Sequence, residues 1–132
     1  MERSTVRVLV VDDYEPFRRF VSSTLEKRPA LQIVGEASGG LEAVRRAEEL
    51  KPDLILLDIG LPTLNGIKAA RQIRKLAPES KIIFLSQESS AEVVQEALNL
   101  GAWGYVVKAR AGSDLLAAVE AVILGKHFVS GR

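Results

Sequence analysis

The chain has 132 residues, 47% hydrophobic and 27% charged, a composition typical of one globular domain with a single core and not of disordered, collagenous or coiled-coil chains. Eighteen basic and 17 acidic side chains give a formal charge of +1, so the sequence has no electrostatic footprint for nucleic acid or an anionic membrane. Cysteine is absent, which excludes disulfides, thiolate catalysis and zinc–thiolate sites. Because no apolar run approaches the roughly 20 residues of a membrane span and no signal peptide precedes the first strand, we expect a cytoplasmic protein.

The first half of the chain contains two strand–helix units. The valine- and leucine-rich run Val6–Val11 predicts a strand that ends in Asp12-Asp13. Apolar residues then recur at helical spacing as far as Leu25, with Pro16 suited to the first helical turn and Asp13 as a possible cap. Residues 31–37 predict a second strand, and residues 41–50 a second helix that ends before Pro52.

A third unit follows around the most apolar run of the sequence. Leu54-Ile55-Leu56-Leu57 is too short for a helix and lies between proline and glycine, which predicts a strand buried on both faces. Asp58 ends this strand, at the rim of the predicted sheet. A loop through Asn65-Gly66 leads to a third helix over residues 67–76.

Two further units complete the chain. Residues 81–86 predict a fourth buried strand that ends in Ser86, followed by a helix over 93–100. Residues 103–108 predict a fifth strand that ends in Lys108, followed by a helix over 115–123. Such regular alternation requires a parallel sheet with helices on both faces and right-handed crossovers, so we expect a three-layer, doubly wound α/β domain of five βα units.

The carboxyl ends of the predicted strands carry a set of polar residues. In a parallel sheet these ends share one edge, where open α/β sheets bind their ligands. The residues expected there are Asp12, Asp13, Asp58, Ser86 and Lys108. Asp53 begins its strand, about 16 Å away at the opposite edge, and is interpreted as a turn residue.

Three crowded carboxylates raise one another's proton affinity unless a cation neutralises them, and hard oxygen ligands suit Mg²⁺. The chemistry that such a set supports is phosphoryl transfer, with a carboxylate as nucleophile, a lysine neutralising phosphoryl oxygens and a hydroxyl donating a hydrogen bond. The only histidine, His127, follows the last helix and is interpreted as a surface or packing residue.

From residue 5 to about 128 the sequence resembles the response-regulator receiver domain of two-component signalling. The resemblance is carried by Val-Val-Asp-Asp at Asp12-Asp13, Leu-Leu-Asp at Asp58 with Leu-Pro-Thr-Leu-Asn-Gly after it, Ser86 after Phe-Leu, and Gly-Tyr-Val-Val-Lys ending at Lys108. Five matching residues, in order at the ends of four strands, are highly specific. Receivers that precede a LuxR-type helix-turn-helix domain are the most similar, through Gly101-Ala102-Trp103-Gly104-Tyr105 and the segment 124–130. We place the domain at 5–128 and the start of a linker or tail at 129–132.

The resemblance implies a flavodoxin-like sheet with strand order 2-1-3-4-5 and a phosphorylation-activated switch. Asp58 would accept a phosphoryl group from the phosphohistidine of a sensor histidine kinase. Mg²⁺ would be held by Asp13, Asp58 and the Gly60 carbonyl, with Asp12 acting through water. Lys108 and Ser86 would bind the phosphoryl group.

The resemblance also implies how the signal leaves the site. Ser86 and Tyr105 would form the switch: Ser86 moves toward the phosphoryl group and the Tyr105 ring turns inward, shifting the face formed by the fourth helix, fifth strand and fifth helix. Homodimerisation on activation and control of transcription are expected. DNA would be contacted only through an output domain outside this chain, and no membrane partner is expected.

The sequence departs from the family pattern at three places. Gln87 stands where a small residue is usual, and Gly60 has no side chain to position an attacking water, so these two residues and Glu88 are expected to modulate the dephosphorylation rate. Ala109 stands where many receivers have proline after the lysine. A cis bond at Lys108-Ala109 would cost about 3–4 kcal/mol without proline, so family geometry there would require strain.

Three alternative functions were compared with the switch. A receiver that binds partners without phosphorylation usually loses an acid, the serine or the lysine, whereas all are present here. A haloacid-dehalogenase-like phosphohydrolase would need a second aspartate two residues after the first-strand nucleophile, which Asp12-Asp13-Tyr14 does not supply. A flavodoxin-like cofactor binder would need a hydroxyl- and glycine-rich loop after the first strand, where acids stand instead. The switch is not an enzyme acting on a separate substrate, although it would catalyse its own phosphorylation and dephosphorylation.

Overall fold

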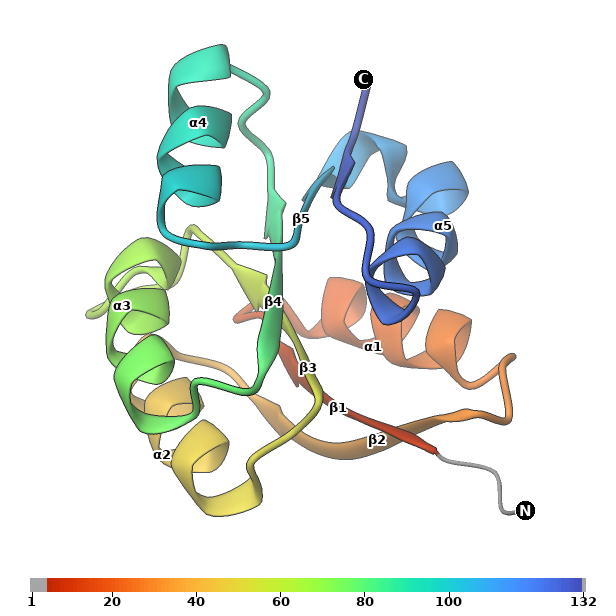
Figure 1. The fold of residues 1–132 in the computed structure, drawn as a ribbon, viewed down its shortest axis with the longest axis horizontal. Helices are drawn as coiled ribbons and strands as arrows, with labels where there is room; N and C mark the ends of the chain where they lie inside the picture. The colour runs from red at the N-terminus through yellow and green to blue at the C-terminus, as the bar shows by residue number, and fades with distance from the viewer. Residues whose placement is uncertain (1–4, 132) are drawn as a thin grey trace.

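The computed structural model describes residues 5–131 and places one parallel sheet between two layers of helices (Figure 1). The strands are β1 (Val6–Val11), β2 (Leu31–Ala37), β3 (Leu54–Asp58), β4 (Lys81–Ser86), β5 (Gly104–Val107) and β6 (Phe128–Val129). The helices are α1 (Glu15–Leu25), α2 (Gly40–Leu50), α3 (Gly66–Leu76), α4 (Ala91–Asn99) and α5 (Ala111–Ile123), with a short 3₁₀ turn, η1 (Lys108–Arg110). The predicted α/β class is confirmed.

The sheet has the order β2-β1-β3-β4-β5-β6, and every neighbouring pair of strands is parallel. The expected order 2-1-3-4-5 is therefore confirmed, and the two-residue strand β6 extends it by one position. The sequence did not predict β6, because two apolar residues after Gly125 give no periodic signal.

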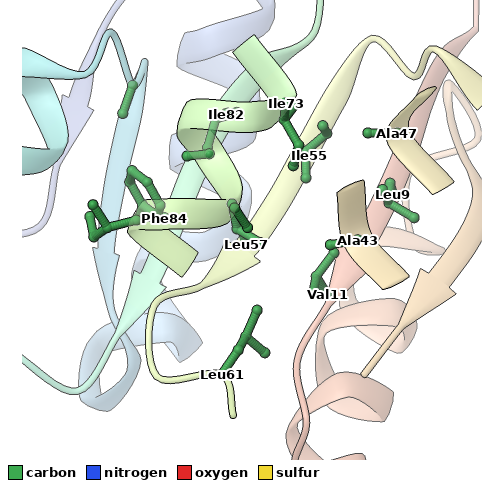
Figure 2. Packing of buried hydrophobic residues seen from close by; sticks show 14 of the residues in the cluster. Leu9, Val11, Ala43, Ala47, Ile55, Leu57, Leu61, Ile73, Ile82 and Phe84 are labelled. Atoms are coloured by element: carbon green, nitrogen blue, oxygen red, sulfur yellow. The ribbon is translucent and has the colours of Figure 1, made fainter. Parts of the chain in front are cut away.

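Alternate residues of each central strand face opposite layers, as the pleat requires. Leu9, Ile55 and Phe84 pack against α2, α3 and α4, in the core that Figure 2 shows together with Ala43, Ala47 and Ile73. Their chain neighbours Val10, Leu56 and Leu85 belong to a second core with α1 and α5. The sheet thus separates two hydrophobic cores. The alternation of side chains along each strand decides which of the two sides a residue at the strand end faces.

The details at the strand ends correct two expectations, the cap of α1 and the end of β5, and answer the open question of a cis bond after Lys108. Tyr14, not Asp13, is the N-cap residue of α1, and no side chain caps that helix; Pro16 does lie in its first turn. No cis peptide bond occurs in residues 5–131, so the Lys108-Ala109 bond is trans and needs no cis strain. β5 also ends one residue before Lys108, which begins η1.

None of the helices within residues 5–131 is long and apolar enough to cross a membrane.

Candidate functional site

The carboxyl edge of the sheet brings Asp12 and Asp58 together from adjacent strands. Val11 pairs with Leu57, so the two aspartates that follow leave β1 and β3 at the same level. By the alternation along their strands, both side chains face the side of the sheet that α1 and α5 cover. Both residues are buried, with 0% and 4% of their surface exposed. Asp13 is exposed beside them. Two buried carboxylates on neighbouring strands need a cation nearby.

Lys108 supplies a positive charge at this point. Its Nζ lies 2.7 Å from Asp12 Oδ2 and 3.4 Å from Asp58 Oδ1, and 14% of its side chain is exposed. Lys108 begins η1, directly after β5, and its ammonium reaches past β4 to the ends of β3 and β1. One lysine therefore lies beside two buried acids.

The electrostatics of Asp58 follow from this crowding. Burial raises the pKa of the Asp58 carboxyl above its ordinary value of 3.8, and the negative charge of Asp12 raises that pKa further. The Lys108 charge and hydrogen bonds from the Gly60 N–H and Lys108 lower it, without cancelling the rise. The site thus attracts a second positive charge.

The oxygen atoms fit a hard divalent cation. Asp12, Asp13 and Asp58 each offer a carboxylate oxygen, and these three oxygens lie within 4.8 Å of one another. Asp12 Oδ1 accepts the Tyr14 N–H, whereas Oδ2 is buried and has no hydrogen bond of good geometry, its contact with Lys108 being an ion pair only. Such an oxygen-only acidic set suits Mg²⁺.

The Tyr105 ring lies on the opposite side of the sheet from the two aspartates, and Ser86 lies at the carboxyl edge, in the wall of the same hollow as Asp58. The Tyr105 ring is fully buried in the α2–α3–α4 core, and its hydroxyl donates to the Glu88 carbonyl at 2.8 Å. Ser86 Oγ accepts the Glu88 N–H at 3.0 Å. Burial raises the pKa of the Tyr105 hydroxyl. A hydrogen bond with Ser86 lowers this pKa, and the Glu88 charge raises it. Tyr105 is already turned inward here, tied to the loop after β4.

A hollow of about 870 Å³ opens over these groups. Asp13, Asp58, Ser86 and Lys108 lie at its wall, as do the three residues expected to modulate rates, Gly60, Gln87 and Glu88. All five strand-end residues that the sequence predicted thus lie in or beside one site. Asp53, by contrast, accepts the Arg7 N–H at 2.8 Å at the other end of β3, as expected of a turn residue.

Two residues at the site were missed or undervalued in the sequence. Phe17, the fourth residue after Asp13, places its ring 4.7 Å from Lys108 Nζ, and the helical pattern gave it only a packing role. Gly66 was interpreted as an ordinary turn residue, but a Cβ there would overlap the backbone carbonyl of Asp58. A glycine eight residues after the key acid was the available signal.

His127 and Trp103 lie away from the site. Trp103 is half-buried, and His127 is exposed and stacks on its ring, as the expected surface or packing role requires.

Comparison with known proteins agrees with this geometry. The family described as the response regulator receiver domain matches residues 8–120. The response regulator protein VraR of Staphylococcus aureus is 37% identical over 122 residues, which are 92% of this chain and 58% of that protein. The chain thus spans less than two thirds of the length of this curated relative.

Solved structures give the same result. A LuxR-family two-component response regulator from Aurantimonas sp. SI85-9A1 is 33% identical, with a TM-score of 0.91 over 97% of this chain and 91% of that one. The signal receiver domain of the putative response regulator NarL from Mycobacterium tuberculosis is 29% identical, with a TM-score of 0.87 over 94% of this chain and 100% of that one. With the family match, the matched length and the acid, serine and lysine in place, the chain belongs to the response-regulator receiver domains.

Proposed function

We propose that the chain is a phosphorylation-activated switch in which Asp58 is the phosphoryl acceptor. The observation that carries the proposal is the buried Asp58 carboxylate, 3.4 Å from the Lys108 ammonium and open to the hollow. A carboxylate oxygen of Asp58 attacks the phosphorus of a sensor histidine kinase's phosphohistidine. The P–N bond breaks, its electron pair leaves with the imidazole, and Asp58 becomes an acyl phosphate.

Lys108 and Ser86 are the proposed phosphoryl-binding groups. The ammonium neutralises charge on the phosphoryl oxygens, and the hydroxyl donates a hydrogen bond to one of them. In the unphosphorylated state Lys108 contacts Asp12 and Asp58 instead, so it need not travel far to meet the new group.

Mg²⁺ is the proposed cofactor, held by Asp13, Asp58 and the Gly60 backbone carbonyl, with Asp12 acting through a water molecule. When bound, it would neutralise negative charge shared by the carboxylates and the incoming phosphoryl group. The crowding of three carboxylate oxygens within 4.8 Å supports this assignment.

The proposed switch uses Ser86 and Tyr105. If Ser86 turns toward the phosphoryl group, its bond to the Glu88 N–H is lost. The Glu88 carbonyl holds Tyr105 through the 2.8 Å hydrogen bond, so the loop after β4 links the two residues. The face of α4, β5 and α5 would then shift between two populated arrangements. Homodimerisation, regulation of transcription through an output domain and a cytoplasmic location complete the proposal.

Incubation with Mg²⁺ and acetyl phosphate or phosphoramidate tests the proposal. Intact-mass spectrometry should detect one added phosphoryl group, which Asp58→Asn abolishes. Asp53→Asn is the matched control, because it changes an aspartate at the other end of the same strand. Absence of any mass gain in the wild-type chain would favour the alternative, a receiver that binds its partners without phosphorylation.

The lifetime of the acyl phosphate should depend on the residues that line the hollow. Gln87 is exposed there, where its amide restricts access of water, while Gly60 leaves the opposite wall without a side chain. Gln87→Ala should therefore change the dephosphorylation rate more than the Mg²⁺ affinity, as measured by decay of the phosphorylated mass. Equal lifetimes in the two proteins would refute this role, and Glu88→Ala tests the neighbouring residue.

A further inference from the structure

A buried polar pair lies outside the site described so far, between α5 and the segment after β6. The Ser130 hydroxyl donates to Asp114 Oδ2 at 2.8 Å, and only 8% of Ser130 and 9% of Asp114 are exposed. Ser113 Oγ donates to the other carboxylate oxygen at 3.0 Å. Ser130, placed in the linker by the sequence pattern, is thus packed into the domain.

The pair holds the backbone that carries Lys108 from both sides. The N–H of Val107, the residue before Lys108, donates to Ser130 Oγ at 3.0 Å. Arg110, two residues after Lys108, donates from Nε to Asp114 Oδ2 at 3.2 Å. Lys108 itself therefore lies between two anchor points that share one carboxylate.

The Ser130 hydroxyl takes the place of a backbone acceptor just beyond the end of β6. β6 ends at Val129, which pairs with Tyr105, and the Ser130 N–H donates to the Tyr105 carbonyl at 2.9 Å. The Val107 N–H has no backbone partner on β6 and takes the Ser130 hydroxyl instead. The hydroxyl oxygen accepts this bond while the hydroxyl donates its own hydrogen bond to Asp114. The hydrogen bond from Ser130 is the largest cause that lowers the pKa of Asp114.

We propose that Asp114 and Ser130 are positioning residues for phosphoryl transfer, fixing the β5–η1 junction so that Lys108 Nζ meets the phosphoryl oxygens on Asp58. This inference rests on the proposed function. Lys108 reaches across the β4 position to Asp12 and Asp58, so a small displacement of its backbone is carried to the ammonium. A misplacement of about 1 Å can cost about 10²-fold in rate.

The same contacts make the C-terminal strand part of the site. β6 pairs with β5, which carries the proposed switch residue Tyr105 and leads directly into Lys108, the proposed phosphoryl-binding residue. Trp103, the only tryptophan, stacks on His127 with ring centroids 4.5 Å apart and an interplanar angle of 6°. Its fluorescence therefore reports directly on whether the segment before β6 is docked.

The test measures the initial rate of Asp58 phosphorylation against acetyl phosphate concentration at saturating Mg²⁺, in the full chain. Ser130→Ala should lower the maximal rate at least about fivefold, a fraction of the loss expected for a full 1 Å displacement, with Mg²⁺ affinity unchanged. Ser130→Thr keeps the hydroxyl and should restore most of the rate. Asp114→Asn should slow the reaction in the same direction.

Ser80→Ala is the matched control. Ser80 is also buried, with 4% exposed, and its hydroxyl bonds the Pro52 carbonyl at the opposite edge of the sheet. It should lower the melting temperature as Ser130→Ala does while leaving the phosphorylation rate unchanged. If Ser130→Ala fails to fold, Asp114→Asn and Ser130→Thr carry the comparison.

A double-mutant cycle separates positioning from general loosening. If Ser130 acts through Lys108, then Lys108→Ala and Lys108→Ala/Ser130→Ala should phosphorylate at the same rate, and Trp103 fluorescence should change in every variant that lacks the hydroxyl. A wild-type rate in Ser130→Ala, or losses that multiply in the double variant, would overturn the inference. A wild-type chain that takes no phosphoryl group would instead overturn the proposed function.

Discussion

Strand β3 lies between two aspartates, Asp53 just before it and Asp58 at its end, and the two differ in exposure and in the charged groups around them. Asp53, just before the strand, is exposed and accepts one backbone N–H from Arg7. Asp58, at its end, is 4% exposed, lies beside a second buried acid, and has a raised pKa because of burial and of Asp12. An aspartate is thus a turn residue at one edge of the sheet and a buried carboxylate beside Lys108 at the other.

The two edges also differ in how they use a lysine beside an aromatic ring. Lys81 Nζ lies 4.3 Å from the Trp103 ring, and Lys108 Nζ lies 4.7 Å from the Phe17 ring. Only Lys108 also contacts two carboxylates. Two buried carboxylates beside one lysine, rather than the presence of charges alone, therefore distinguish the carboxyl edge of the sheet, and the following predictions test that contrast.

Removal of the functional lysine should give the largest effect. Lys108→Ala should slow phosphorylation of Asp58 by about 10²–10³-fold, the loss typical of removing one charge-stabilising donor. Lys81→Ala should leave the rate within about twofold, since its cation–π contact with Trp103 and its hydrogen bond to the Val122 carbonyl both lie at the other edge of the sheet. Rates from intact-mass time courses check both, and equal losses in the two variants would remove the distinction between the edges.

The backbone after β3 approaches Asp58 closely at Gly66, where a side chain should be poorly tolerated. Gly66→Ala would force a Cβ against the Asp58 carbonyl, and we expect a loss of about 3 kcal/mol in the free energy of unfolding. Gly112→Ala is the control, since nothing lies within 4 Å of its Cβ and alanine favours the first turn of α5. Urea unfolding of both variants measures the difference; a Gly66→Ala protein as stable as the wild type would contradict the close approach.

The raised pKa of Asp58 gives the site a defined pH dependence without Mg²⁺. The folded chain holds the Asp58 proton more tightly than the unfolded chain, so its stability falls as pH rises from 3.8 through the raised pKa. Asp58→Asn abolishes this loss and should therefore increase the free energy of unfolding at pH 7.

Denaturant melts at several pH values test this sign. Asp53→Asn, which weakens the bond from the Arg7 N–H, should instead lower stability slightly. Mg²⁺ should raise the melting temperature of the wild type and not that of Asp58→Asn. A destabilised Asp58→Asn protein in magnesium-free buffer would contradict the raised pKa.

The smallest effect should come from the aromatic ring over the lysine. Phe17→Leu deletes a cation–π contact of about 0.5–1 kcal/mol and should slow phosphorylation by about two- to fivefold. Phe17→Trp should restore the rate. Phe20→Leu, which changes an aromatic residue of the same helix that also lines the hollow, should have less effect than Phe17→Leu in the same assay.

The sequence was sufficient for whatever depended on short-range patterns. Buried runs such as Leu54–Leu57 end abruptly in a polar residue, and a parallel sheet gathers those ends at one edge, so Asp58 and Lys108 could be placed without coordinates. Asp13 as a helix cap was wrong because the Asp12 carboxylate, not that of Asp13, accepts the Tyr14 N–H. The next residue, Tyr14, then occupies the N-cap position of α1 without a side-chain hydrogen bond to the helix.

Long-range side-chain contacts could not be predicted. Ser130 meets Val107 across 23 residues, and nothing in the pattern after Gly125 distinguishes a docked strand from a linker. Phe17 lies over Lys108 only because α1 and η1 share one side of the sheet. Such contacts depend on how whole elements pack, which local periodicity does not record.

The alternation of side chains along the strands has one more consequence. Asp12 and Asp58 lie on the α1–α5 side of the sheet, whereas the Tyr105 ring belongs to the α2–α3–α4 side. The sheet therefore separates the two acids from the Tyr105 ring, and under the proposed function the two sides are linked at the carboxyl edge, through the loop after β4. Inserting a single residue between Tyr105 and Lys108 would reverse the alternation after the insertion, so the Lys108 side chain would start from the side of the Tyr105 ring and both acids would lose their counter-charge.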